Sequence, residues 1–181
     1  IGIEEIRNEI FAGLRAVQKR ISSKFFYNRE GSELFGEITR LEEYYPTRTE
    51  ISILQEFVEE IMDGMTDIDI LELGSGDCTK ISILLNSVNS SQIASLRYLP
   101  VDVSKSVLLE AAKQLSESYP SLRVEGVRAD FLTQFNLIPG DANRLICFFG
   151  STIGNLTREQ AHNFIREISQ SMHKGASLLI G

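Results

Sequence analysis

From residue 67 onward, short apolar segments alternate with amphipathic ones, and this alternation restricts the possible folds more than any other feature of the chain. The segment Leu145-Ile146-Cys147-Phe148-Phe149 is apolar throughout, as expected for a strand that is covered on both faces. Between the strand segments, helical patterns begin near Gly76, Ser104 and Thr157. The pattern predicts an α/β fold with a doubly wound sheet of five parallel strands. These strands are expected at residues 68–73, 97–103, 122–127, 145–149 and 177–180.

Residues 1–66 have a different pattern, which is helical and contains no strand signal. An apolar stripe at helical spacing runs from Ile3 to Ile21 and predicts one amphipathic helix. Further helices are expected at residues 32–40 and after Pro46, where Thr47 and Glu50 resemble a capping box. We therefore divide the chain into a helical region, 1–66, and an α/β region, 67–181. Because the last strand segment lies at the end of the chain, we expect further strands to follow in the intact protein.

Composition narrows the class of partner. The chain has 18 Lys and Arg against 25 Asp and Glu, a formal net charge of −7, which disfavours broad binding to nucleic acid. It contains no apolar run long enough for a membrane span. Cys78 and Cys147 are isolated, and His162 and His173 lie in a polar helical segment. These patterns predict a cytoplasmic protein with reduced thiols, no metal site and a small-molecule partner, and they leave its oligomeric state open.

The turn Gly74-Ser75-Gly76 follows the first predicted strand directly. Such a turn lets a ligand approach the backbone, and the next helix offers free N–H groups to an anion. A phosphate-binding P-loop requires Gly-Lys-Ser/Thr where this chain has Thr79-Lys80-Ile81, and the dinucleotide fingerprint requires glycine at Thr79. The remaining ligands have no pyrophosphate. One is S-adenosylmethionine, whose carboxylate Lys80 can pair with, although Lys80 is equally consistent with a solvated surface lysine.

Acidic residues follow the next two predicted strands. Asp102 lies 102 − 76 = 26 residues after Gly76 and can accept hydrogen bonds from ribose hydroxyls. Asp130 can accept a bond from an adenine amine while the ring of Phe131 packs on the base. Each aspartate alone is also consistent with a helix cap or a turn. Together with the glycine turn, they predict a binding edge at the carboxyl ends of three strands.

Several segments of the chain together match a known family pattern: Phe26-Tyr27, Gly31–Phe35, Ile38–Leu41, Glu43–Glu50, Glu72–Gly76, Pro100–Ser104 and Gly150–Leu156. They resemble the histidine-specific, S-adenosylmethionine-dependent N-methyltransferases. The best-known member type makes hercynine, which is trimethylated at the α-amine, on the route to ergothioneine. The resemblance implies a Rossmann-like class I methyltransferase sheet, incomplete at its C-terminus here, with an N-terminal helical region that contributes to the substrate pocket.

The resemblance also implies roles for individual residues. The cofactor would be held by Gly74, Lys80, Asp102, Asp130 and Phe131, to which the turn pattern adds Gly76. The amino-acid substrate would be bound by Tyr27, Tyr44 and Asn155, with Phe35 as a wall, and Tyr44 and Asn155 would orient the reacting amine. Without the resemblance, the two tyrosines are as well explained as core aromatics.

Two departures from the family pattern accompany these expectations. Asp77 and Cys78 stand where the family usually has small hydroxylated residues, and Asp77 adds negative charge near the proposed carboxylate site. The family's C-terminal portion, which supplies contacts to the imidazole, lies beyond residue 181. The sequence therefore predicts methylation of the α-amino group of L-histidine by the intact protein, with little turnover by residues 1–181 alone. Alternatives are methylation of another small amine, a nicotinamide-dependent oxidoreductase and a non-catalytic nucleotide-binding domain.

Overall fold

The computed structural model describes residues 2–139 and 143–181. Its centre is a sheet in which every recorded strand pair is parallel, in the order β3-β2-β1-β5-β6, with β4 also paired to β2. The predicted parallel α/β fold is therefore confirmed. The strands are β1 (Asp69–Leu73), β2 (Arg97–Asp102), β3 (Arg123–Val124), β4 (Val127–Arg128), β5 (Arg144–Phe148) and β6 (Ser177–Ile180).

The strand predicted at residues 122–127 is interrupted, so the prediction was wrong in detail. The strands β3 and β4 each pair with β2, and residues 125–126 separate them. The Glu125 N–H still donates to the Tyr98 carbonyl, and Gly126 lies against Leu108 of the helix that covers it, where a Cβ would be 3.4 Å from the Leu108 Cβ.

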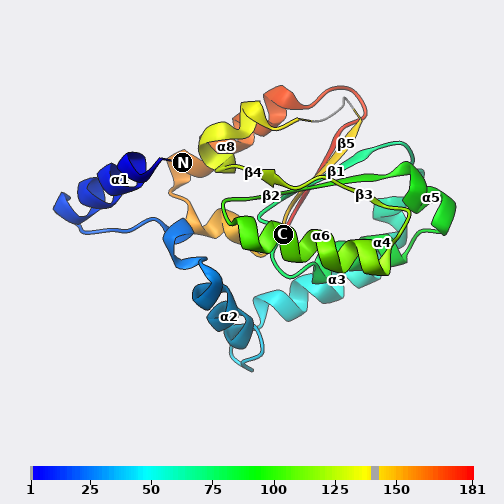
Figure 1. The fold of residues 1–181 in the computed structure, drawn as a ribbon, viewed down its shortest axis with the longest axis horizontal. Coiled ribbons are helices and arrows are strands. Elements are labelled where there is room, and N and C mark those ends of the chain that lie inside the picture. The colour runs from blue at the N-terminus through cyan, green and yellow to red at the C-terminus, as the bar shows by residue number, and fades with distance from the viewer. Residues whose placement is uncertain (1, 140–142) are drawn as a thin grey trace.

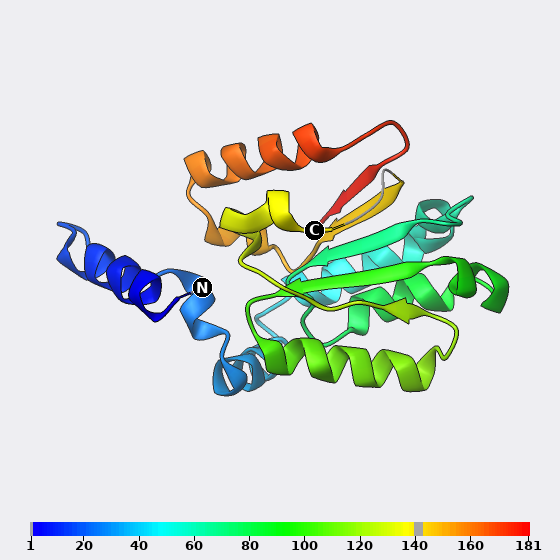
Figure 2. The ribbon, with the colours of Figure 1, turned by 45° about the horizontal axis from the view of Figure 1, so that its top comes forward.

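Helices cover both faces of the sheet (Figures 1 and 2). The helices α4 (Thr79–Asn86) and α6 (Lys105–Ser118) lie on one face, and α8 (Arg158–Ser171) lies on the other. As expected from strand geometry, Ile70 packs in the core on the α4 side and its neighbour Leu71 packs in the core on the α8 side. The short elements are η1 (Ser23–Phe26), α5 (Ser90–Ser95), α7 (Phe131–Gln134), η2 (Phe135–Leu137) and η3 (Thr152–Asn155).

The N-terminal region contains α1 (Ile3–Arg15), α2 (Arg29–Ile38) and α3 (Pro46–Met62), and α1 projects away from the sheet (Figure 1). The helix predicted through Ile21 ends at Arg15. The chain turns back at that point, where the Arg20 N–H donates to the Gly13 carbonyl. A Cβ at Gly13 would lie 2.2 Å from the Arg20 oxygen, so this turn requires glycine.

The start of α3 also differs from the prediction. The helix begins at Pro46, with Tyr45 as its N-cap and no side-chain cap, because proline suits the first helical position. The expected Thr47–Glu50 capping box is therefore wrong, and the Glu50 carboxylate is engaged elsewhere. By contrast, Thr157 and Gln160 form a capping box at the start of α8, where a helical pattern was predicted to begin.

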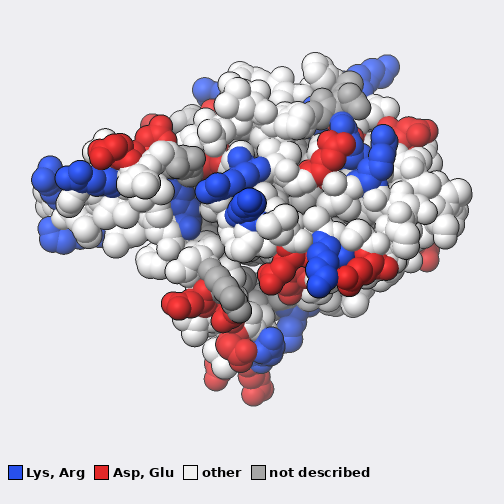
Figure 3. All heavy atoms as spheres, in the orientation of Figure 1, with Lys and Arg blue, Asp and Glu red and all other residues white. Residues whose placement is uncertain are grey.

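On the face in Figure 3, Lys and Arg side chains are interspersed with Asp and Glu, without a continuous basic area among the atoms described. Within residues 2–139 and 143–181, no helix is long and apolar enough to cross a membrane.

Candidate functional site

The glycine turn joins β1 to α4 in a left-handed backbone conformation. The φ angle is +80° at Gly74 and +53° at Gly76, a region that glycine enters without steric cost. The Gly74 N–H donates to the Val101 carbonyl, which ties the turn to β2. Asp77 is exposed, and its Oδ1 accepts from the Thr79 N–H at 3.1 Å. The residue that departs from the family pattern therefore satisfies one of the free donors at the start of α4.

Ser75, at the centre of the turn, has a buried hydroxyl. Among the described residues its Oγ is the buried side-chain oxygen without a hydrogen-bond partner, and the side chain is almost fully enclosed. Buried polar atoms are nearly always paired, so an orphaned one commonly marks a place where a ligand or water completes the bonding. This hydroxyl fits a ligand site at the turn.

A buried polar pair lies in the strands just before the turn. The Tyr98 hydroxyl on β2 donates to the Glu72 carboxyl on β1. Burial raises the pKa of Glu72 to about 8, against the hydrogen bond from Tyr98 and the charge of Lys80, which lower it. Burial also raises the pKa of the Cys78 thiol to about 12 and that of Cys147 well above its ordinary value. Both thiols are thus neutral near pH 7 and unsuited to act as nucleophiles.

Lys80 lies on the first turn of α4, at the predicted edge. Its Nζ is 2.7 Å from Glu50 Oε2 on α3 and 5.7 Å from the centre of the Phe149 ring. The lysine and glutamate side chains are only 17% and 11% exposed. Lys80 is therefore a partly buried cation rather than a solvated surface lysine, and it already contacts a carboxylate.

Asp102 ends β2, as predicted, and is half-buried. Its Oδ1 accepts from the Ser104 N–H at 2.8 Å. Burial raises the pKa of this carboxyl, and the backbone hydrogen bonds partly oppose that effect. A carboxylate has about four acceptor positions, so Asp102 retains capacity for ribose hydroxyls.

Asp130 is the buried N-cap of α7 and has two partners in this structure. Its Oδ1 accepts from the Leu132 N–H at 3.1 Å, and its Oδ2 lies 2.8 Å from Lys24 Nζ. Lys24 also pairs with Glu9 on α1 at 2.8 Å. Burial lowers the pKa of Lys24, but the hydrogen bonds and charges of its two acidic partners outweigh burial and the net shift is upward.

The Phe131 ring lies beside the glycine turn, where a Cβ at Gly74 would be 3.9 Å from it. Its centre is 5.6 Å from those of both Phe148 and Phe164. The ring that is predicted to pack on adenine is therefore itself part of an aromatic cluster in the core.

Three residues predicted to bind substrate come together in one aromatic row. The Phe35 ring lies between Tyr27 and Tyr44, at centre distances of 6.0 and 5.9 Å with edge-to-face geometry. All three side chains are half-buried. Asn155 ends η3 and is exposed, five residues after Gly150. The aromatic row comes from the segment 27–44, whereas Asn155 comes from η3.

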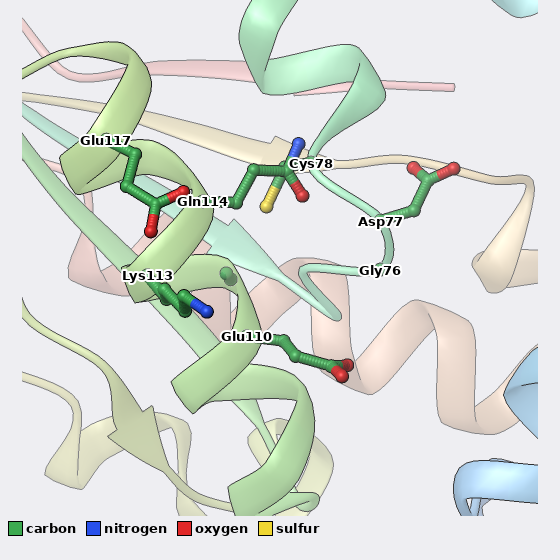
Figure 4. Close-up of a pocket in the computed structure, with 8 residues that line it drawn as sticks. Gly76, Asp77, Cys78, Glu110, Lys113, Gln114 and Glu117 are labelled. Carbon is green, nitrogen blue, oxygen red and sulfur yellow. The ribbon is translucent and has the colours of Figure 1, made fainter.

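Two hollows flank this edge. A groove of about 390 Å³ between α3 and the ends of β5 and β6 contains Tyr45, Glu50, Phe149, Ser151 and Gly181 among its lining residues. The other, of about 430 Å³, lies between the glycine turn and α6 (Figure 4). Of the predicted cofactor residues, only Gly76 lines this second hollow. Its lining residues are Gly76, Asp77, Cys78, Glu110, Ala111, Lys113, Gln114 and Glu117.

Four polar residues of this edge were not assigned to the site from sequence. Glu50 and Lys24 pair with predicted cofactor residues from far away in the chain, and no local pattern marks such partners. Glu72 and Tyr98 had a visible signal, a carboxylate and a hydroxyl within otherwise apolar strands. Among the described residues, no group of His, Cys, Asp or Glu has the arrangement of a metal site.

The sheet order and the glycine turn agree with the class I S-adenosylmethionine-dependent methyltransferase fold. A putative methyltransferase of this class from Methanococcus maripaludis superposes with a TM-score of 0.54 at 21% identity, over 92% of this chain and 66% of its own. Residues 6–181 match the family described as histidine-specific methyltransferase, SAM-dependent, and the chain belongs to that family.

Two relatives in the family carry the name histidine N-alpha-methyltransferase. The protein from Mycolicibacterium smegmatis is 39% identical over 98% of this chain and 55% of its own length. The protein from Mycobacterium tuberculosis is 38% identical over 97% of this chain and 54% of its own. The chain thus spans about half the length of these relatives.

Proposed function

We propose that the intact protein transfers methyl groups from S-adenosylmethionine to the α-amino group of L-histidine. The observation that supports this proposal is the position of Lys80, Asp102 and Asp130, which follow the carboxyl ends of the parallel strands β1, β2 and β4, together with a left-handed glycine turn that has an orphaned hydroxyl. Family membership and the two histidine methyltransferase relatives support the substrate.

The residues of this edge fit the methyl donor in charge and shape. Lys80 would hold its carboxylate, Gly74 and Gly76 would admit its amino-acid end, and Asp102 would accept from its ribose. Phe131 would pack on the adenine, and Asp130 would accept from the adenine amine through lone pairs that its present partners leave unused. When bound, S-adenosylmethionine supplies a methyl group on a sulfonium, from which a neutral thioether departs.

The protein then has to orient an unprotonated amine. We assign this role to the Tyr44 hydroxyl and the Asn155 side chain, which would bind the amine hydrogens and direct the nitrogen lone pair toward the methyl group. Attack by the nitrogen would form the nitrogen–carbon bond as the sulfur–carbon bond breaks, and the methylated amine would release a proton to water before each further transfer. In this proposal the N-terminal helical region supplies Tyr27, Phe35 and Tyr44 as one wall of the substrate pocket.

Substitution at the two polar residues tests the mechanism. In the intact protein, Asn155→Ala and Tyr44→Phe should each lower kcat/KM for histidine by about 10- to 100-fold, because one orienting hydrogen bond is lost in the transition state. Tyr119→Phe, which removes a hydroxyl bonded to Asn86 at the C-terminal ends of α6 and α4, is the matched control. Wild-type kcat/KM in both site variants would remove these residues from the mechanism.

The substrate is tested separately by mass spectrometry of products. Histidine and other small amines are incubated with the intact protein and S-adenosylmethionine. Up to three added methyl groups on histidine are expected. Methylation of another amine in preference to histidine would keep the reaction and replace the substrate.

A further inference from the structure

Glu50 connects three segments to which the proposed function gives separate roles. It lies on the first turns of α3, six residues after Tyr44. Its Oε2 is 2.7 Å from Lys80 Nζ, at the cofactor edge. Both carboxylate oxygens also accept from the Gly150 N–H, at 2.8 and 3.1 Å. One side chain thus joins the tyrosine segment, the cofactor lysine and the start of the loop that leads to Asn155.

The loop that leads to Asn155 begins at this contact. Gly150 and Ser151 both have left-handed backbone angles, with φ of +77° and +52°, before η3 begins. A Cβ at Gly150 would lie 3.3 Å from Lys80 Nζ, and one at Gly181 would lie 2.1 Å from Glu50 Oε1. The carboxylate is therefore enclosed between two glycine backbones and the lysine, and a strained backbone is held at that point.

In the proposed function, the positive charge of Lys80 pairs with the carboxylate of the methyl donor. Lys80 and Glu50 are mostly buried, so solvent and salt screen their interaction only weakly. A lysine ammonium has three donors and can contact two carboxylates, but two such carboxylates repel each other strongly in a partly buried site. A second carboxylate at Lys80 therefore opposes the binding of the first.

We propose that Glu50 is a positioning residue that competes with the carboxylate of the methyl donor for Lys80, and so couples cofactor binding to the Asn155 loop. The proposal rests on the proposed function. When a ligand carboxylate accepts a hydrogen bond from Lys80, Glu50 loses part of its own bonding to the lysine. Glu50 then accepts more strongly from the Gly150 N–H. The loop that carries Asn155 is then held more firmly in the cofactor-bound protein than in the free protein.

Affinity measurements test the competition. S-adenosylhomocysteine, which retains the carboxylate and cannot react, is titrated calorimetrically into the intact wild-type protein and into Glu50→Gln. The neutral amide keeps an acceptor for Gly150 and removes the competing charge, so binding should tighten about fivefold. 5′-Methylthioadenosine lacks the amino-acid end, and its affinity should not change. Glu56→Gln, at an exposed position of the same helix, is the control variant.

Amide hydrogen exchange tests the coupling without any substitution. In the wild-type protein, S-adenosylhomocysteine should slow exchange of the Gly150 N–H at least threefold more than 5′-methylthioadenosine does. Glu50→Gln should retain protection of this amide in the free protein, whereas Glu50→Ala should lose it and show a higher KM for histidine.

Equal or weaker binding of S-adenosylhomocysteine by Glu50→Gln would overturn the competition. Equal Gly150 exchange with the two ligands would overturn the coupling, even if the variants do not fold. Failure of the intact wild-type protein to bind either ligand would instead refute the proposed function, so the two failures are distinguishable.

Discussion

The two regions of the chain are built on different principles. In residues 67–181, the apolar strand residues are enclosed on both faces, and Ile70, Leu71 and Leu73 are fully buried. In residues 1–66, apolar side chains such as Ile3, at 83% exposure, lie largely on the surface, and Leu54 and Met62 are the described apolar residues that are buried there. Leu54 and Met62 of α3 belong to the core on the α4 side of the sheet, whereas the segments before α3 reach the α/β region through polar pairs such as Lys24 with Asp130. Packing therefore joins α3 to the sheet region, and specific charges join the segments that precede it.

The largest effect should come from a cavity in the sheet. Ile70→Ala removes a fully buried side chain and should lower the free energy of unfolding by about 3 kcal/mol. Ile3→Ala, the matched change on α1, should alter it by less than about 0.5 kcal/mol. Urea denaturation of both variants measures the difference. Similar losses would show that the N-terminal region is packed as tightly as the sheet.

The next effect should appear with pH, and it arises from the sheet region. Burial raises the pKa of Glu72 from 4.5 to about 8, so the folded protein holds a proton that the unfolded chain releases between these values. Stability therefore falls as pH rises through this window, by about 2 kcal/mol between pH 6 and 7.5. Glu72→Gln should flatten this part of the urea-denaturation profile.

Glu110→Gln removes an exposed carboxylate from α6 and serves as its control, which should keep the wild-type slope. A Glu72→Gln profile with the same slope as the wild type would show that Glu72 is already ionised in the folded protein.

A smaller effect is expected where the helical region is joined by charge. Lys24→Met removes the cation shared by Asp130 and Glu9, and should cost about 1 kcal/mol because the lysine remains partly exposed. Amide exchange in α1 should accelerate while that in β1 stays unchanged. Lys113→Met, which removes an exposed lysine from α6, is the control. Unchanged exchange in α1 would show that this ion pair does not hold the N-terminal region.

The sequence predicted those features of the fold that short-range residue patterns determine. Buried strands have nearly continuous apolar runs, so the parallel sheet and the edge bearing Gly74, Asp102 and Asp130 followed from residue order. The apolar stripe from Ile3 to Ile21 predicted too long a helix, because hydrophobic periodicity carries no information on the turn at Gly13, where the backbone folds back on the helix. The partners Glu50 and Lys24 were not predicted because long-range charge pairs have no fixed spacing.

A crystal structure of the intact protein with S-adenosylhomocysteine examines the adenosyl site without depending on any rate or stability. We expect its carboxylate at Lys80, its ribose at Asp102 and its adenine between Asp130 and Phe131. Electron density for the ligand in the hollow between Gly76 and α6, with Lys80 and both aspartates uncontacted, would contradict the assignment.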